Sequence, residues 1–412
     1  MRAPVGPGHV PEPPAWAREL ATVGVTGTNG KTTTTTWIAW ILRALGRPVV
    51  RATTVGYYVD DDELPHARDW TGFVEAMQTG RARGARHAVI ELTSEALARG
   101  FARAWPSSVG VFTNLSHDHL DAHGSPEHYL ASKAQLVVSL PPGGTMVLNA
   151  CDEVASLLRE VVPEGVSPVT YGVLARGATR IPCDVEAEEV HVSWAGTRVL
   201  CKSIIPLFPR EISVRGIGPV FAENALAAVL GAHSAGVPLD IAARAIADAP
   251  VPRGRFEVVA TRPWVVVDYA HTPDALARTV DAGRQVAGRG SLFVVFGAGG
   301  GRDSAKRAPM GEATRAADRI VLTPDNPREE APEEIARAVA AGLDGHAGVT
   351  VELDRARAIQ RAVEEAEPED VILVCGKGHE REQIMGRDRR PFDDVEIARA
   401  AHRRRGPARP VL

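Results

Sequence analysis

Apolar runs of strand length alternate with helix-length segments through most of this chain, and no other feature restricts its fold as strongly. In the first half, continuous apolar runs stand at 21–25, 87–92, 108–115 and 145–150. Runs of this kind are typical of strands buried on both faces, as in a parallel sheet covered by helices. We therefore expect an α/β protein.

A second series of the same kind lies in the last third of the chain, at 264–269, 291–297, 319–323, 348–353 and 371–376. Between the two series, polarity alternates over 184–216, which predicts an antiparallel excursion before a helix at 221–236. The proline- and glycine-rich segment 249–257 is typical of a linker. The resulting prediction is a short proline-rich leader at 1–21, a doubly wound domain at 22–252 and a smaller Rossmann-like α/β domain at 253–412.

Composition excludes several classes of function. The 412 residues are 44% apolar and 24% charged, as in ordinary globular proteins, and the net charge of −4 gives no general attraction to nucleic acid or an anionic membrane. No run approaches the roughly 18 apolar residues of a membrane span. Four scattered cysteines without a C-x-x-C pair suggest neither a zinc site nor a dithiol, and they fit a reducing cytoplasm. We expect small-molecule substrates, while the oligomeric state stays open.

The stretch "VGVTGTNGKTTTTTWIAW" (23–40) places a glycine loop between a strand and a helix. It departs from the common phosphate-loop pattern, which requires a glycine where Val25 stands. Even so, Gly27 and Gly30 would let backbone N–H groups approach a phosphate closely. Lys31 can neutralise phosphate charge, and the Thr32 hydroxyl can ligate magnesium. A simple glycine turn is the alternative, but Lys31 and Thr32 directly after Gly30 favour a phosphate-loop ATPase-type domain.

Two segments of the first domain resemble the Mur ligase family, the ATP-dependent amide-forming enzymes of peptidoglycan assembly. "GVTGTNGKTTT" (24–34) is similar to the family's ATP loop, and "TNLSHDHLDAHGSPEHYLASKAQLV" (113–137) to its central block. The resemblance implies ATP and Mg²⁺ as cofactors. It also implies nucleotide contacts from Gly27, Thr28, Asn29, Gly30, Lys31, Thr32 and Thr33.

The same resemblance implies the metal ligands and the reaction. Thr32, Glu91, His119 and Lys133 would hold magnesium, with Lys133 as the lysine that family members carbamylate, since an ammonium cannot ligate a cation but a carbamate can. The implied catalytic residues are Lys31, His119, Lys133 and Arg302. A carboxylate would attack the γ-phosphorus of ATP, and an amine would then displace phosphate from the acyl phosphate to form an amide.

Four motifs of the second half resemble the branch of this family that adds the third amino acid to a muramyl dipeptide: "VVVDYAHTPDAL" (265–276), "FGAGGGRDSAKRAPMGEA" (296–313), "TPDNPREEAPEEI" (323–335) and "CGKGHE" (375–380). By that resemblance ATP would also contact Asn224, Arg255, Asp268 and His271, with Lys306 near the reaction centre. The amino-acid substrate would contact Arg302, Asp325, Asn326, Arg328, Gly376 and Glu380. "DNPR" is the form associated with meso-diaminopimelate, whose distal carboxylate Arg328 would hold through its guanidinium fork.

Several departures from that branch fall on the side of the carboxylate substrate. Few residues precede the loop strand, so we expect no uridine-binding domain. Thr93, Ser94 and Glu95 replace a serine-serine-histidine run, and Phe101 stands where an arginine is expected, with Arg99 or Arg103 as conceivable substitutes. The stretch 53–72 lacks the family's threonine-threonine-proline turn, and its first part, "TTVGYYVDDDE" (53–63), is more similar to cyanophycin synthetase. These departures favour a ligase for a smaller carboxylate than a UDP-muramyl peptide.

Three alternatives stay open at this point. The chain could be a true muramyl-tripeptide ligase whose uridine-binding domain comes from a partner. It could be a polymerising ligase of the cyanophycin type, which would give a ladder of products. A non-catalytic nucleotide-binding scaffold predicts the loss of Lys31, Glu91, His119 or Lys133, and all four are present.

Overall fold

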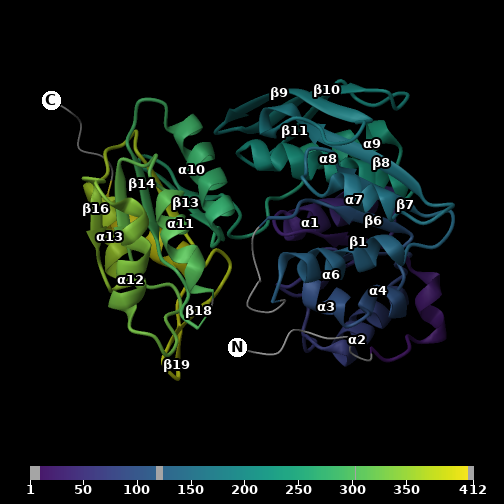
Figure 1. Ribbon diagram of the computed structural model, residues 1–412, viewed down its shortest axis with the longest axis horizontal. Helices are drawn as coiled ribbons and strands as arrows, with labels where there is room; N and C mark the ends of the chain where they lie inside the picture. Colours follow the sequence, from purple (N-terminus) through teal and green to yellow (C-terminus); the bar gives the residue numbers. More distant parts are fainter. Residues whose placement is uncertain (1–9, 117–123, 302, 407–412) are drawn as a thin grey trace. The chain divides into compact units, whose positions relative to one another are not determined.

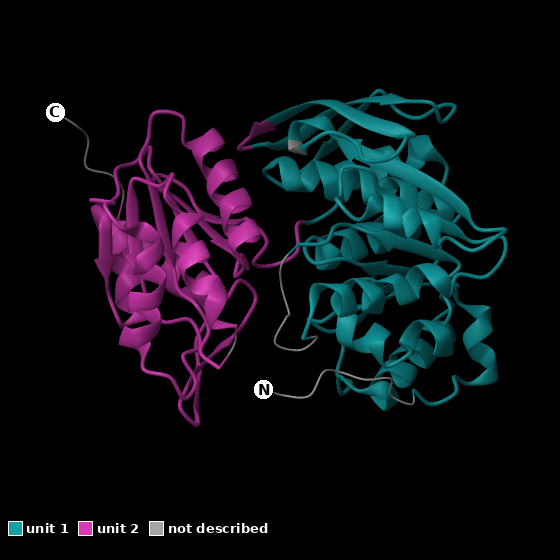
Figure 2. Ribbon diagram, in the orientation of Figure 1, with its two compact units in different colours: residues 1–191, 195–250 teal, residues 192–194, 251–412 magenta. Residues whose placement is uncertain are grey.

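The computed structural model describes residues 10–116, 124–301 and 303–406. The chain divides into two compact units, shown in teal and magenta in Figure 2: unit 1 comprises 1–191 and 195–250, and unit 2 comprises 192–194 and 251–412. Both units are α/β, each with a mainly parallel sheet, which confirms the predicted fold class. No helix in the described ranges is long and apolar enough to cross a membrane.

Unit 1 contains an eleven-stranded sheet in the order β11-β10-β9-β8-β7-β6-β1-β5-β2-β3-β4. Its central strands, from β8 to β2, are parallel, and β1 lies between β5 and β6, with Val23 beside Val89 on one side and Val109 on the other. The strands are β1 Ala21–Thr26, β2 Val49–Ala52, β3 Tyr57–Val59, β4 Asp62–Leu64, β5 His87–Glu91, β6 Val109–Phe112, β7 Thr145–Asn149, β8 Ser167–Val173, β9 Val185–Ser193, β10 Gly196–Ser203 and β11 Glu211–Val214.

Helices cover both faces of this sheet (Figure 1). They are α1 Lys31–Leu42, α2 Trp70–Ala82, α3 Ser94–Ala98, α4 Phe101–Ala104, α6 Pro126–Val138, α7 Ala155–Glu160, α8 Pro219–Ser234 and α9 Leu239–Ala247. Helices α1, α8 and α9 pack against one another on one face, and α3 and α6 lie on the other. Successive residues of β6 show this two-sidedness, because Gly110 faces Leu136 of α6 whereas Val111 faces α8.

Unit 2 contains a six-stranded sheet in the order β12-β13-β17-β14-β15-β16, parallel except for β12, and a separate β18–β19 hairpin. The strands are β12 Glu257–Ala260, β13 Trp264–Asp268, β14 Leu292–Phe296, β15 Arg319–Leu322, β16 Val349–Val351, β17 Val371–Cys375, β18 Glu382–Met385 and β19 Asp388–Pro391. The helices are α10 Pro273–Ala287, α11 Arg307–Glu312, α12 Pro332–Ala340, α13 Arg355–Glu365 and α14 Asp394–Arg405. Residues of α13 and α14 share one buried core with β13, β14 and β17.

In both units the motifs from the sequence stand at the carboxyl edge of the parallel strands. The glycine loop follows β1, Glu91 ends β5, and Thr113 and Asn114 follow β6. In unit 2, Asp268 ends β13 and Gly376 directly follows β17. Ligands of open α/β sheets bind at this edge, beside the strands where the chain reverses its order.

Candidate active site

Hydrogen bonds join the glycine loop to the residues that directly follow β6. Thr28 N donates to Asn114 O (2.8 Å), Asn29 N to Asn114 Oδ1 (2.9 Å), and the Thr113 hydroxyl to Asn29 O (2.6 Å). Gly27 lies so close to these residues that a Cβ there would stand 1.9 Å from Thr113 Oγ1. The backbone N–H groups of residues 28 and 29 are therefore occupied. The start of α1, directly after the loop, is the part of a helix that favours an anion such as phosphate.

Gly30, directly before α1, has a left-handed conformation, with φ of 83°. A Cβ at this position would lie 2.3 Å from Asn224 Oδ1, which also accepts from the Thr34 hydroxyl at 3.4 Å. Asn224 is buried in α8. In unit 1 it therefore lies directly against the glycine loop, while its predicted contact with adenine stays a prediction.

Two lysines converge on the loop from different parts of the chain. Lys31 Nζ donates to Thr28 O at 2.8 Å, and Lys133 Nζ, from α6, donates to Gly27 O at 2.7 Å. The Lys133 side chain is 1% exposed, and its ammonium also stands 4.5 Å from the centre of the Tyr129 ring. The fold thus brings Lys133, the predicted carbamylation site, to the loop, although Lys133 and Gly27 are separated by 106 positions.

Thr32 and Glu91 form an oxygen cluster beside the loop. Glu91 Oε2 accepts from the Thr32 hydroxyl at 3.0 Å and from Thr54 N at 3.2 Å, and Oε1 accepts from the Thr54 hydroxyl at 3.3 Å. Hydroxyl and carboxylate oxygens are the ligands that Mg²⁺ prefers. The residues fit that ion, even though no group of three or more His, Cys, Asp or Glu side chains with metal-binding geometry occurs within the described ranges.

Two of the predicted catalytic residues cannot be placed. His119 and Arg302 both lie outside the described residues. The prediction that His119 ligates a magnesium ion, and the prediction that Arg302 contacts the reacting groups, therefore stay predictions.

In unit 2, the residues predicted to contact the nucleoside surround the end of β13. Both carboxylate oxygens of Asp268 accept hydrogen bonds, from Phe256 N (2.6 Å), Ala270 N (2.9 Å) and the Thr279 hydroxyl (3.0 Å). The Arg255 guanidinium lies over the Tyr269 ring at 4.4 Å, and the His271 ring lies 4.6 Å from the same ring. Arg255 and His271 thus share one aromatic neighbour, and Asp268 holds the loops that carry them.

The predicted amino-acid ligands form a second cluster in unit 2. Asn326 Nδ2 donates to Glu380 Oε2 at 2.9 Å, and Gly376 is so close to Asp325 that a Cβ there would lie 2.8 Å from Asp325 Oδ2. Lys377, to which the sequence analysis assigned no role, donates to Asn326 Oδ1 and to Glu380 Oε2, each at 3.1 Å. The quoted motif "CGKGHE" contained this lysine, but only the fold shows that it points into the cluster.

A buried ion pair lies next to this cluster and contacts the residue before Gly376. Arg355 donates to both oxygens of Asp394, at 2.9 and 2.7 Å, and to Cys375 O at 2.9 Å. Both side chains are 0% exposed. Burial raises the pKa of the Asp325 carboxyl, and the positive charges of Arg355 and Lys377 offset only part of this effect.

Arg328 is held by backbone contacts on both sides. Its backbone bridges to Met385 of β18 and has a positive φ of 53°, while Nη1 donates to Gly300 O at 2.5 Å. Left-handed backbone is uncommon for a residue with a Cβ and is often found at ligand sites. The loop that carries the carboxylate of Asp325 and the amide of Asn326 thus also carries the guanidinium of Arg328.

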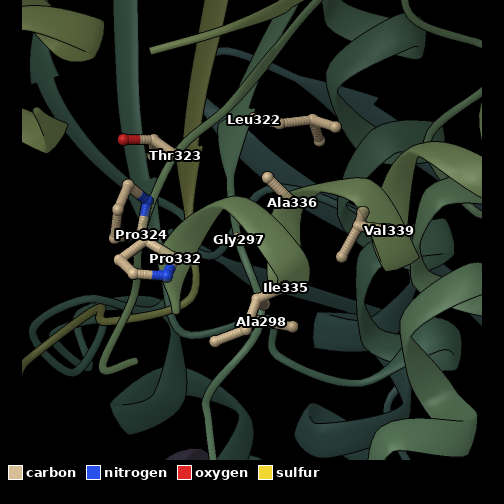
Figure 3. Close-up of a pocket in the computed structure, with 9 residues that line it drawn as sticks. All are labelled: Gly297, Ala298, Leu322, Thr323, Pro324, Pro332, Ile335, Ala336 and Val339. Atoms are coloured by element: carbon tan, nitrogen blue, oxygen red, sulfur yellow. The ribbon is translucent and has the colours of Figure 1, made fainter. Parts of the chain in front are cut away.

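A small cavity lies behind this loop (Figure 3), with a volume of about 10 Å³. Its walls come from the ends of β14 and β15 and from α12: Gly297, Ala298, Leu322, Thr323, Pro324, Pro332, Ile335, Ala336 and Val339. A space of this size holds at most one water molecule. It is therefore too small to be the amino-acid site.

One residue that departs from the family pattern, Phe101, has a packing explanation. Phe101 contacts Phe73 and Trp70, with ring centres 5.1 and 5.9 Å apart, so it packs against the core of unit 1, where it is partly buried. Arg99 and Arg103 line a hollow of about 1290 Å³ beside Ala21 and Thr22, at the amino end of β1. The glycine loop follows the other end of that strand, so neither arginine lies beside the ATP loop. That one of them replaces the missing arginine on the side of the carboxylate substrate stays a prediction.

Comparison with known proteins gives matches over nearly the whole chain. The family model for the Mur ligase middle domain matches residues 25–232, and that for the Mur ligase glutamate ligase domain matches 254–378. The chain is 37% identical to the UDP-N-acetylmuramoyl-L-alanyl-D-glutamate–2,6-diaminopimelate ligase of Synechococcus elongatus, over 93% of this chain and 77% of that protein. The ligase of the same name from Geobacillus kaustophilus is 38% identical, over 94% and 80%.

Solved structures give the same result for the fold. A structure of a UDP-N-acetylmuramoyl-L-alanyl-D-glutamate–2,6-diaminopimelate ligase is 32% identical and superposes with a TM-score of 0.65, covering 93% of this chain and 78% of its own. Mycobacterium tuberculosis folylpolyglutamate synthase complexed with ADP superposes with a TM-score of 0.72 at 18% identity, covering 95% and 91%. At that identity the second likeness concerns the fold alone.

Proposed function

We propose, since this chain belongs to the Mur ligase family, that it joins 2,6-diaminopimelate to UDP-N-acetylmuramoyl-L-alanyl-D-glutamate. Mur ligases are ATP- and Mg²⁺-dependent ligases that act on small molecules, and this chain is an enzyme of that kind. The observation that carries the choice of amine is the cluster of Asp325, Asn326, Arg328 and Glu380 around one loop. The names of the relatives support the same acceptor, in preference to the smaller carboxylate that the sequence departures favoured.

The residues of unit 1 account for activation of the carboxylate. N–H groups at the start of α1 would bind the phosphates, and the Lys31 ammonium would neutralise the charge that grows between the β- and γ-phosphates. Thr32, Glu91 and a carbamylated Lys133 would hold magnesium, with His119 as a further ligand. That ion, when bound, lowers the repulsion between the phosphate and carboxylate anions. The acceptor carboxylate then attacks the γ-phosphorus, ADP leaves, and an acyl phosphate results.

The residues of unit 2 account for the amine. Glu380 and Asp325 would bind an ammonium of diaminopimelate, and Asn326 and Arg328 a carboxylate. With one end of the molecule held in this way, the amine at the other end attacks the acyl carbon, and inorganic phosphate leaves as the amide forms. Fixing both reactants removes much of the entropic barrier to this step.

Arg328→Ala should lower the preference for diaminopimelate over lysine. Lysine lacks the distal carboxylate, and a charge-assisted bidentate contact is worth about 1.5–3 kcal/mol, or roughly 10–100-fold in kcat/KM. We expect the loss with diaminopimelate alone, while the low activity with lysine is unchanged. An equal loss with both amines would show that Arg328 does not read the distal carboxylate.

The proposed function is tested by incubating the chain with ATP, Mg²⁺, diaminopimelate and UDP-N-acetylmuramoyl-L-alanyl-D-glutamate. The mass of the product is then measured by mass spectrometry. One added diaminopimelate per acceptor, with equimolar phosphate release, is the expected result. A ladder of products would indicate a polymerising ligase instead.

A second candidate is ligation of a smaller carboxylate, which the Thr93-Ser94-Glu95 run and Phe101 favour. It predicts phosphate release with short dipeptides or hydroxy acids and none with the UDP-linked acceptor. The same incubation, repeated with these acceptors, separates the two candidates.

A further inference from the structure

Lys377 is a fully buried cation at the centre of the amino-acid cluster. Its side chain is 0% exposed, and Nζ lies 3.1 Å from Asn326 Oδ1, 3.1 Å from Glu380 Oε2 and 3.8 Å from Asp325 Oδ1. Burying an ammonium is costly unless it is paired and hydrogen-bonded. The three partners that stabilise this one are all residues assigned above to the amino-acid substrate.

The contact with Lys377 helps to fix the orientation of the Asn326 amide. Asn326 Oδ1 accepts from Lys377 Nζ and from Ile384 N, at 3.1 and 3.0 Å. Both partners of this atom are donors, so it is the amide oxygen. The other terminal atom is therefore the nitrogen, which donates one N–H to Glu380 Oε2 at 2.9 Å. Its second N–H is then left to donate to a substrate.

Lys377 also makes the two carboxylate oxygens of Glu380 differ in their hydrogen bonds. Oε2 accepts from both Lys377 and Asn326, whereas Oε1 has no hydrogen-bond partner among the residues that the structure describes. The Glu380 side chain is 33% exposed, so Oε1 can be reached from solvent. One amide N–H and one carboxylate oxygen thus remain, which complement the carboxylate and the ammonium of an amino acid.

We propose that Lys377 is a positioning residue of the amino-acid site, which selects the atoms of Asn326 and Glu380 that face the incoming amino acid. This inference rests on the proposed function. Without the ammonium, Asn326 Oδ1 would lose a donor, the amide could rotate, and Glu380 and Asp325 would be left as two neighbouring carboxylates without their shared cation.

Lys377→Met tests the inference, because methionine keeps most of the volume and removes the charge. We expect the KM for diaminopimelate to rise at least tenfold, in line with a lost charge-assisted network, while the KM for ATP changes less than twofold. Arg284→Met is the matched control: Arg284 pairs with Asp318 in the same unit, but Asp318 precedes β15, at the other end of the strands. This control should leave both KM values unchanged.

A double-mutant cycle with Glu380→Gln separates positioning from a general structural role. If Lys377 acts through Glu380, the double variant should raise the KM for diaminopimelate little more than Glu380→Gln alone; additive effects would overturn the inference. An unchanged KM in Lys377→Met would overturn it too. If the unaltered chain forms no product with diaminopimelate, the proposed function fails and the inference fails with it. Should Lys377→Met not fold, Lys377→Gln, which keeps a donor toward Asn326, carries the same measurement.

Discussion

Lys31→Ala is expected to lower ATP-dependent amide formation by about 10²–10³-fold or more. The ammonium stands at the start of α1, where it can neutralise the charge that develops on the transferred phosphoryl group, and single groups of this kind contribute about that much to rate. Its hydrogen bond to Thr28 O lies within the glycine loop, so we expect little change in the stability of the fold. Phosphate release and ATP affinity, measured together, check the prediction.

The matched control is Lys202→Ala, on the exposed side of β10 in the same unit. It removes the same charge without touching the loop, so turnover should be unchanged. Lys31→Arg is a stricter comparison, because it keeps the charge but replaces a compact ammonium by a planar fork. Normal turnover in Lys31→Ala would mean that the glycine loop is not the nucleotide site.

Among the variants discussed, Arg355→Met should lower the free energy of unfolding most, by about 3–5 kcal/mol, because it leaves the Asp394 carboxylate buried without its partner. Burial by itself lowers the pKa of the Arg355 guanidinium, but the charge of Asp394 and its hydrogen bonds more than offset this and leave that pKa raised, so the guanidinium keeps its charge. Hydrogen exchange resolved by peptide is the suitable measurement, since the two units need not unfold together. We expect faster exchange in β17, whose Cys375 carbonyl accepts from Arg355.

Peptides from β1 and β5 serve as the internal reference and should exchange as before, because they belong to unit 1. The double variant Arg355→Met/Asp394→Asn should regain a large part of the lost protection, since no buried charge is then left unpaired. If the double variant is as unstable as the single one, the lost hydrogen bond to Cys375 O matters more than the unpaired carboxylate.

The sequence predicted the strands that are buried on both faces. It did not predict the short polar strands that exist only because they pair with a neighbouring strand. The apolar runs that became β5, β6, β7 and β17 are buried on both faces, so their composition marks them without reference to a neighbour. By contrast, β3 and β4 are three residues each, and β4 has the sequence DEL. The β18–β19 hairpin, EQIM and DRRP, is similarly polar. Such segments are strands only because a partner strand satisfies their backbone, and local composition does not record that.

The sequence by itself determined the α/β class, the glycine loop and the chemical types of residue at the site, because each depends on a short stretch: a buried strand, a turn that only glycine tolerates, or a local motif. Tertiary structure alone decided which distant side chains meet. Lys133 reaches the loop across 106 positions and Lys377 reaches Asn326 across 51, and the same packing brings Phe101 against the aromatic residues of the unit 1 core. The physical reason is that strand order, not spacing along the chain, determines which loops share the carboxyl edge of a parallel sheet.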